Sequence, residues 1–151
     1  TLHTNDAISV IPRLIDIGIR PYLISNSLIC CIAQRLVRVL CSSCKEKRKA
    51  NAEECKLFKL NPNDAPDIYQ AKGCLKCNNS GFKGRIAVSE IMVISKKIAE
   101  MMALGETTQA IMEQALKEGF VTMAEDGISK ILKGFTTLDE LANTIDMTEY
   151  L

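Results

Sequence analysis

Cysteines are the residues of this chain whose type and spacing most clearly suggest chemistry. Four of the seven form two C-x2-C pairs, Cys41 with Cys44 in CSSC and Cys74 with Cys77 in CLKC, and 29 residues separate the pairs. A C-x2-C turn brings two thiolates to one side of a metal ion, and two such turns complete the tetrahedral shell that zinc prefers. Because this set has no histidine and no open position, it favours a structural zinc over a catalytic one.

Other uses of these thiols stay open at this point. Thiolate tetrads also bind iron–sulfur clusters, paired cysteines form redox-active dithiols, and reduced cysteines can simply fill a core. An odd number of cysteines leaves one over in any full set of disulfides, which favours a reducing compartment. Cys30, Cys31 and Cys55 lie in stretches that we interpret as helical, and we expect them to be ordinary core residues.

Few other residues suggest catalysis. His3 is the only histidine, and a lone histidine is usually structural. Glu90 ends the apolar run IAVSE, but without a nucleotide-binding loop an ordinary strand end is the better interpretation. Neither G-x-x-x-x-G-K-[ST] nor G-x-G-x-x-G occurs, so the chain has no phosphate cradle of its own. The run KEKRK at 45–49 could contact phosphate, although most such runs are solvated surface.

Composition limits the function further. Nineteen basic and eighteen acidic side chains leave a net charge of +1, which gives the whole chain no field that would attract nucleic acid or anionic lipid. With 5% aromatic residues and no tryptophan, stacking on bases is poorly supported. The longest apolar candidate, 22–33, is too short to cross a bilayer. No signal peptide is visible, and because the sequence starts at Thr1 without methionine we expect it to be cut from a longer protein.

The first forty residues show two helical patterns and one strand pattern. Apolar positions predict a helix from about Asp6 to Gly18, with a kink at Pro12. A second helix is predicted from Pro21, a favourable first position, to about Ala33. Alternating side chains then predict a strand over 34–40.

The rest of the chain separates into an excursion, a strand and a helical tail. Between the cysteine pairs, 45–72 contains a short helical stretch, AEECKLFKL, and the loop NPNDAP. Branched residues predict a strand over 85–94. From Ser95 onward the pattern predicts about four short helices, punctuated by three glycines and supported by two capping boxes. The glycines are Gly105, Gly119 and Gly134, and the boxes are Thr122 with Glu125 and Thr137 with Glu140.

Several motifs together resemble one family. TLHTNDA, PRLIDIGI, AQRLVRVLCSSCKE, GCLKCNNSGFKGRIAVSEIM and EGFVTMAEDGISKILKGFTTLDELANTI follow one another as in the C-terminal part of the secretion ATPases. These are the hexameric motors of bacterial type II secretion and type IV pilus assembly. The resemblance implies an α/β fragment in three parts: 1–40 as the C-terminal end of a RecA-like ATPase core, 41–85 as a tetracysteine zinc-binding module, and 86–151 as a strand with a small helical C-terminal subdomain.

The resemblance also implies roles for three residues outside the cysteine set. TLHTNDA resembles the histidine box of the family, so His3 would lie near the terminal phosphate of the nucleotide as the one catalytic-region residue. Arg13 and Arg35 occupy family-like positions and would approach nucleotide or a neighbouring subunit, although each could equally form a surface ion pair. The phosphate loop and the magnesium-side residues of the family all precede the box. ATP and Mg²⁺ therefore belong to the longer parent, and the fragment alone should be inactive.

The expected partners follow from the same family. The resemblance implies a homo-hexamer in the parent, a cytoplasmic location at the inner face of the inner membrane, and contact with the platform protein of the machine, with no nucleic-acid partner. CSSC lacks the proline often found after the first cysteine, and AVSE replaces the usual glycine and tyrosine before the glutamate. The alternative is a free-standing zinc module that binds nucleic acid or an unfolded protein client, because CNNSGFKG faintly resembles a chaperone repeat.

Overall fold

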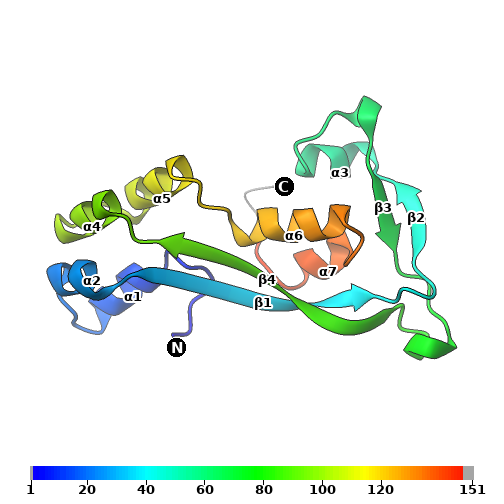
Figure 1. Cartoon of the computed structure of the whole chain (residues 1–151), viewed down its shortest axis with the longest axis horizontal. Helices are drawn as coiled ribbons and strands as arrows, with labels where there is room; N and C mark the ends of the chain where they lie inside the picture. The colour runs from blue at the N-terminus through cyan, green and yellow to red at the C-terminus, as the bar shows by residue number, and fades with distance from the viewer. Residues whose placement is uncertain (1, 148–151) are drawn as a thin grey trace. The chain divides into compact units, whose positions relative to one another are not determined.

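A computed structural model describes residues 2–147, and Figure 1 traces their helices and strands. The chain divides into two compact units, Thr1–Gln34 with Ser89–Met123 and Arg35–Val88 with Ala124–Leu151. Two long strands, β1 (Cys30–Leu40) and β4 (Phe82–Val93), pair with each other and supply residues to both units. The chain is thus of mixed α/β type, as the sequence predicts.

The first unit holds four short helices beside the ends of these strands. They are α1 (Val10–Asp16), α2 (Pro21–Ser27), α4 (Lys96–Ala103) and α5 (Thr108–Lys117). Ser95 and Thr107 begin the last two, where each side-chain oxygen accepts from a backbone N–H three residues on. The core of the unit consists mainly of aliphatic and methionine side chains, among them Ile11, Ile24, Met92, Ile98, Met102 and Ile111.

The helix predicted to run from Pro21 to Ala33 is wrong in its second half. It ends at Ser27, and from Cys30 the chain is strand β1, in which exposed and buried side chains alternate. The N–H of Ile94, just after β4, also donates to the carbonyl of Ile29. A short apolar run fits a helix and a strand equally well, so strand pairing decides between them. Cys30 is consequently an exposed strand residue and not a core residue.

The first helix is also shorter than predicted. It begins at Val10, and Asp6 instead accepts from the N–H of Ser9 in the turn before it. Pro12 therefore lies in the first turn, where backbone N–H groups lack intrahelical partners in any case. No kink is needed to accommodate it.

The second unit contains the excursion between the cysteine pairs and the last two helices. Strand β2 (Glu46–Lys49) pairs antiparallel with β3 (Asp67–Gln70), so that Glu46 faces Gln70. Between them lie α3 (Ala52–Leu57) and the 3-10 turn η1 (Pro62–Asp64). A second 3-10 turn, η2 (Leu75–Cys77), precedes β4. Helix α7 (Leu138–Ala142) lies in this unit. All residues of α6 (Met123–Leu132) except Met123 also belong to it.

Short helices fill the tail, as predicted, and the three punctuating glycines all have positive φ. Thr137 caps α7 by accepting from the N–H of Glu140 at 3.2 Å, but the Glu140 carboxylate is used elsewhere, so the predicted capping box is only half formed. The box predicted for Thr122 and Glu125 stays a prediction. Among residues 2–147 the longest helices have ten residues, about half of what a membrane-spanning helix requires.

Candidate metal centre

The four predicted ligand cysteines come together in the second unit. Cys41 and Cys44 follow the end of β1, and Cys74 and Cys77 belong to the turn before β4. All four Sγ atoms lie within 4.8 Å of one another. Individual separations are 4.0 Å for Cys41 to Cys74 and 3.8 Å for both Cys44 to Cys77 and Cys74 to Cys77.

These separations fit one metal ion. Ligand atoms at the corners of a tetrahedron with zinc–sulfur bonds of about 2.3 Å lie about 3.8 Å apart. These three separations are therefore close to those that a zinc ion would impose, and the remaining ones are no longer than 4.8 Å. Glycines make room for the turns: a Cβ on Gly73 would approach the carbonyl oxygen of Asn79 to 2.7 Å, and one on Gly81 the Cβ of Ala71 to 2.6 Å.

Backbone N–H groups favour the thiolate form of Cys77 in the second pair. The N–H groups of Cys74 and Gly81 donate to the Sγ of Cys77 at 3.2 and 3.3 Å. Burial alone would raise the pKa of this thiol. The two N–H donors and the neighbouring thiols outweigh burial, and the pKa is lowered to about 6. Burial raises the pKa of the Cys44 thiol to about 12. Since metals bind thiolates, loading this site would release protons, and its metal affinity should fall in acid.

One hydrogen bond joins the two cysteine turns at their base. The N–H of Cys41 donates to the carbonyl of Gly81 at 2.9 Å. Within the second turn itself, the Ser80 hydroxyl donates to the carbonyl of Cys77 at 2.6 Å and also lies 3.0 Å from that of Phe82. The backbone just after β1 and the backbone just before β4 are therefore joined directly at the cysteine turns.

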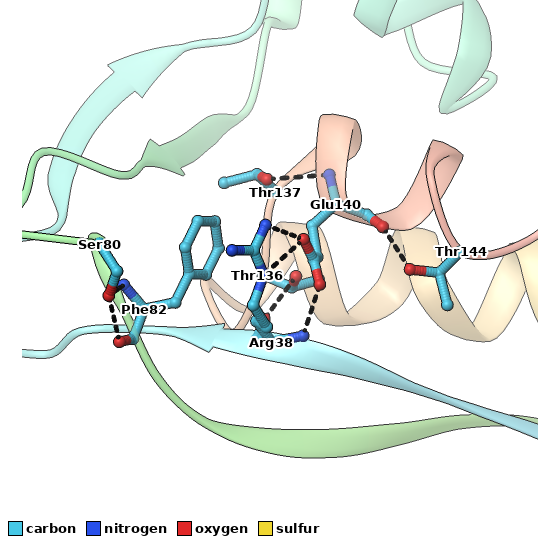
Figure 2. A network of polar contacts seen from close by, with 7 residues as sticks. All are labelled: Arg38, Ser80, Phe82, Thr136, Thr137, Glu140 and Thr144. Carbon is cyan, nitrogen blue, oxygen red and sulfur yellow. Dashed lines mark hydrogen bonds and ion pairs between the residues drawn. The ribbon is translucent and has the colours of Figure 1, made fainter. Parts of the chain in front are cut away.

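Beside this base, an ion pair attaches α7 to β1 (Figure 2). The N–H of Arg38 donates to Oε1 of Glu140 at 2.9 Å, and its guanidinium donates to Oε2 through Nε at 2.9 Å and Nη2 at 2.5 Å. The same guanidinium lies 4.3 Å from the centre of the Phe82 ring. Thr136, fully buried, donates to the carbonyl of Arg38. The sequence alone does not reveal this network, because Arg38 and Glu140 are 102 residues apart.

The basic run beside the first cysteine pair is engaged within the excursion. Lys47 and Lys49 contact the Asp67 carboxylate at 2.7 and 3.2 Å, and Arg48 pairs with Glu54 at 2.5 Å. Hydrogen bonding to Arg48 lowers the pKa of the Glu54 carboxyl, although burial opposes the shift. These cations hold β2, β3 and α3 together, and a phosphate would have to compete with carboxylates already in place.

A further lysine connects the excursion to the tail. Lys45 donates to the carbonyl of Gly134 at 2.8 Å and lies 4.3 Å from the centre of the Tyr69 ring. A Cβ on Gly134 would come within 2.6 Å of that ring. The turn between α6 and α7 therefore depends on glycine to approach the excursion.

The other predicted site residues are not gathered at the metal centre. His3 and Arg13 are exposed in the first unit, and Arg35 is exposed on β1 in the second. Their roles towards nucleotide stay predictions. Glu90, interpreted from the sequence as an ordinary strand end, is instead a buried carboxylate bonded to two distant segments. The only signal for it was a charge within an apolar run.

Sequence comparison identifies the class of protein that carries this fold and site. Residues 1–143 match the family described as "Type II/IV secretion system protein", and the chain belongs to that family. It is 39% identical over 141 residues to "Type II secretion system ATPase E" of Vibrio cholerae. The aligned region covers 93% of this chain and 28% of the relative. It is 40% identical over 149 residues to "Type IV pilus assembly ATPase PilB" of Thermus thermophilus, covering 97% of this chain and 17% of the relative. The chain thus spans less than a third of the length of either.

Proposed function

We propose that this chain is the C-terminal region of a hexameric motor ATPase that powers type II protein secretion or type IV pilus assembly. The observation that carries the proposal is the family match over residues 1–143, together with relatives whose names state both activities. In this proposal the parent acts on the cytoplasmic side, at the inner face of the inner membrane.

Residues 1–40 form the end of a RecA-like core in this proposal. His3 lies near the terminal phosphate of ATP, where it senses or polarises the phosphate and its bound Mg²⁺, an electrostatic role typical of phosphoryl transfer. Arg13 and Arg35 approach the nucleotide or a neighbouring subunit. Because the phosphate loop belongs to the preceding part of the parent, the fragment alone neither binds ATP well nor hydrolyses it.

We propose that the four cysteines hold a structural zinc ion. Support comes from the four Sγ atoms, which lie within 4.8 Å of one another with three separations of 3.8–4.0 Å, and from the N–H groups of Cys74 and Gly81, which donate to the Sγ of Cys77. The excursion 45–72 has few buried side chains of its own, and closing it with a metal stabilises elements that would not fold alone. When bound, the ion supplies rigidity and no reactive water, because all four positions are taken by sulfur.

Metal analysis tests the zinc proposal. Protein purified without added metal should contain about one zinc per chain, and a Cys74→Ser, Cys77→Ser double variant should lose it together with protease resistance of residues 41–85. A Cys55→Ser variant, which removes a buried thiol outside the cluster, should keep the metal. Iron in place of zinc, or metal retained in the double variant, would refute the proposal.

Activity of the parent tests the motor proposal. The longer protein should hydrolyse ATP, and His3→Ala should reduce kcat strongly while this chain alone stays inactive. A parent that lacks ATPase activity under conditions in which it is folded and oligomeric would contradict the motor assignment.

We also propose that the excursion 45–72 contacts the platform protein in the inner membrane. This proposed contact is supported by the structure of the excursion, which forms its own set of elements, β2, α3 and β3, held together by internal ion pairs. Deleting residues 45–72 should abolish capture of the cytoplasmic domain of the platform protein. Unchanged capture would count against this contact.

A further inference from the structure

Glu90 is the buried acid whose burial and bonding the proposed function does not explain. It lies on β4 between Val88 and Met92, both fully buried, and only 5% of its own surface is exposed. Its Oε1 accepts from the N–H of Ala7 at 2.5 Å, and its Oε2 accepts from the N–H of Met123 at 2.9 Å. One carboxylate therefore joins a strand to segments 83 residues before it and 33 residues after it, all within the first unit.

Both oxygens find partners that suit a charged acceptor. Burying a carboxylate without hydrogen bonds is very costly, and here each oxygen receives a backbone N–H. Met123 is the first residue of α6, where N–H groups have no intrahelical partner and the helix dipole favours negative charge. A neutral amide at position 90 would offer only one acceptor atom to two donors.

The bond to Ala7 fixes the chain four residues after His3. Residues 2–6 are exposed or half-buried, whereas Ala7 is fully buried and is the first buried residue of the described chain. Ile8 and Ile11 follow it into the core, and Asp6 accepts from the N–H of Ser9. Ala7 is thus a buried point at which the segment carrying His3, four residues earlier, is attached to the unit.

We propose that Glu90 is a positioning residue that sets the place of the His3 segment against β4 and against the start of α6. This inference rests on the proposed function, because it matters for ATP hydrolysis only if His3 lies at the terminal phosphate. Glu90 does not touch the nucleotide, since it is buried and both its oxygens accept from the protein.

Amide hydrogen exchange in this chain tests the anchor itself. Glu90→Gln should raise the exchange rate of the Ala7 or the Met123 amide by about tenfold or more, because one of the two N–H groups loses its acceptor. Glu90→Asp, which is one methylene shorter, should disturb both. Glu106→Gln, at an exposed acid between α4 and α5, is the matched control and should leave both amides unchanged. Wild-type rates for both amides in Glu90→Gln would overturn the inference.

Steady-state kinetics of the full-length parent test the positioning role. Glu90→Gln should lower kcat by about tenfold or more while KM for ATP stays within about twofold, because a displaced histidine affects the transition state more than nucleotide binding. Metal content and oligomeric state should match the wild type. Unchanged kcat despite faster amide exchange would reduce Glu90 to a structural anchor and overturn the proposal. If the wild-type parent has no ATPase activity, the motor proposal fails instead, and the exchange experiment still decides whether the anchor exists.

Discussion

Single residues far apart in the sequence make the contacts that fix α7 in the second unit. Glu140 binds the backbone and the guanidinium of Arg38, while Thr136 donates to the Arg38 carbonyl. Nothing in either local sequence indicates this pairing, because ion pairs between distant segments depend on the fold. The cysteine cluster, in contrast, was predicted from the type and spacing of its residues, since a metal restricts both the identity and the spacing of its ligands.

The Arg38–Glu140 pair should make stability depend on pH. Hydrogen bonding to Arg38 lowers the pKa of the Glu140 carboxyl below its usual value near 4.5, against the opposing effect of burial. A lowered pKa in the folded state means that the stabilisation is complete above about pH 5 and is lost as the pH falls through the folded pKa. Glu140→Gln should therefore reduce the free energy of unfolding by about 1–3 kcal/mol near neutral pH, with a smaller difference in acid.

Urea unfolding of both proteins across pH 3–8 measures this difference. Glu106→Gln serves as the control, because it changes an exposed carboxylate and should have little effect at any pH. A deficit in Glu140→Gln that stays constant down to pH 3 would show that the charge of Glu140 contributes nothing.

Gly134 allows a second test with a matched control. It has φ +72°, and a Cβ there would lie 2.6 Å from the Tyr69 ring and 3.2 Å from Nζ of Lys45. Gly84 has a similar φ of +83°, but a Cβ there would meet nothing within 4 Å. Gly134→Ala should therefore lower the melting temperature more than Gly84→Ala, which shares only the backbone strain. Equal losses would show that contact with Tyr69 is unimportant.

At the scale of elements, the sequence predicted whether a segment is helix or strand better than it predicted where each helix or strand begins and ends. The helical tail was recognisable because glycines and capping residues punctuate it, and the strand over 34–40 because its side chains alternate. Residues 30–33 were assigned to a helix, since an apolar run of that length has no period of its own. Pairing with β4, which lies more than fifty residues later, makes them strand.

Helix α3 offers a prediction about local structure. Its capping box is complete, because Asn51 accepts from the N–H of Glu54 and the Glu54 carboxylate accepts from the N–H of Asn51, both at 2.8 Å. Asn51→Ala should destabilise the protein by about 1 kcal/mol and speed amide exchange within α3. Asn63→Ala, a change at an exposed position of η1, should have a much smaller effect. Equal exchange rates in the two variants would contradict the importance of the cap.

At the scale of the whole molecule, each unit has its own buried core. Ile98 and Ile111 are buried in the first, and Ile68 and Leu141 in the second. Motifs in the right order were enough to predict the family, because they depend on residue identity along the chain. The grouping of residues 35–88 with the last two helices was not predictable, since it follows from contacts such as those of Arg38 and Lys45.

Metal removal should separate the behaviour of the two units. A strong chelator should increase amide exchange across residues 41–85, while the core of α4 and α5 keeps its protection, because the proposed zinc belongs to the second unit. Hydrogen exchange measured by mass spectrometry, with and without chelator, follows both at once. Exchange that rises equally in both units would show that the chain unfolds as one body when the metal leaves.

The four clustered cysteines lie at the two ends of the excursion, and this arrangement affects how the protein can change over evolutionary time. Each doubling of an enclosed loop costs only about 0.6 kcal/mol in closure entropy. Residues 61–64 are exposed and can therefore gain or lose length while the pairing of β2 with β3 keeps its register. New surface can be added at this turn with little cost to β1 and β4, which leaves the excursion free to diverge between lineages.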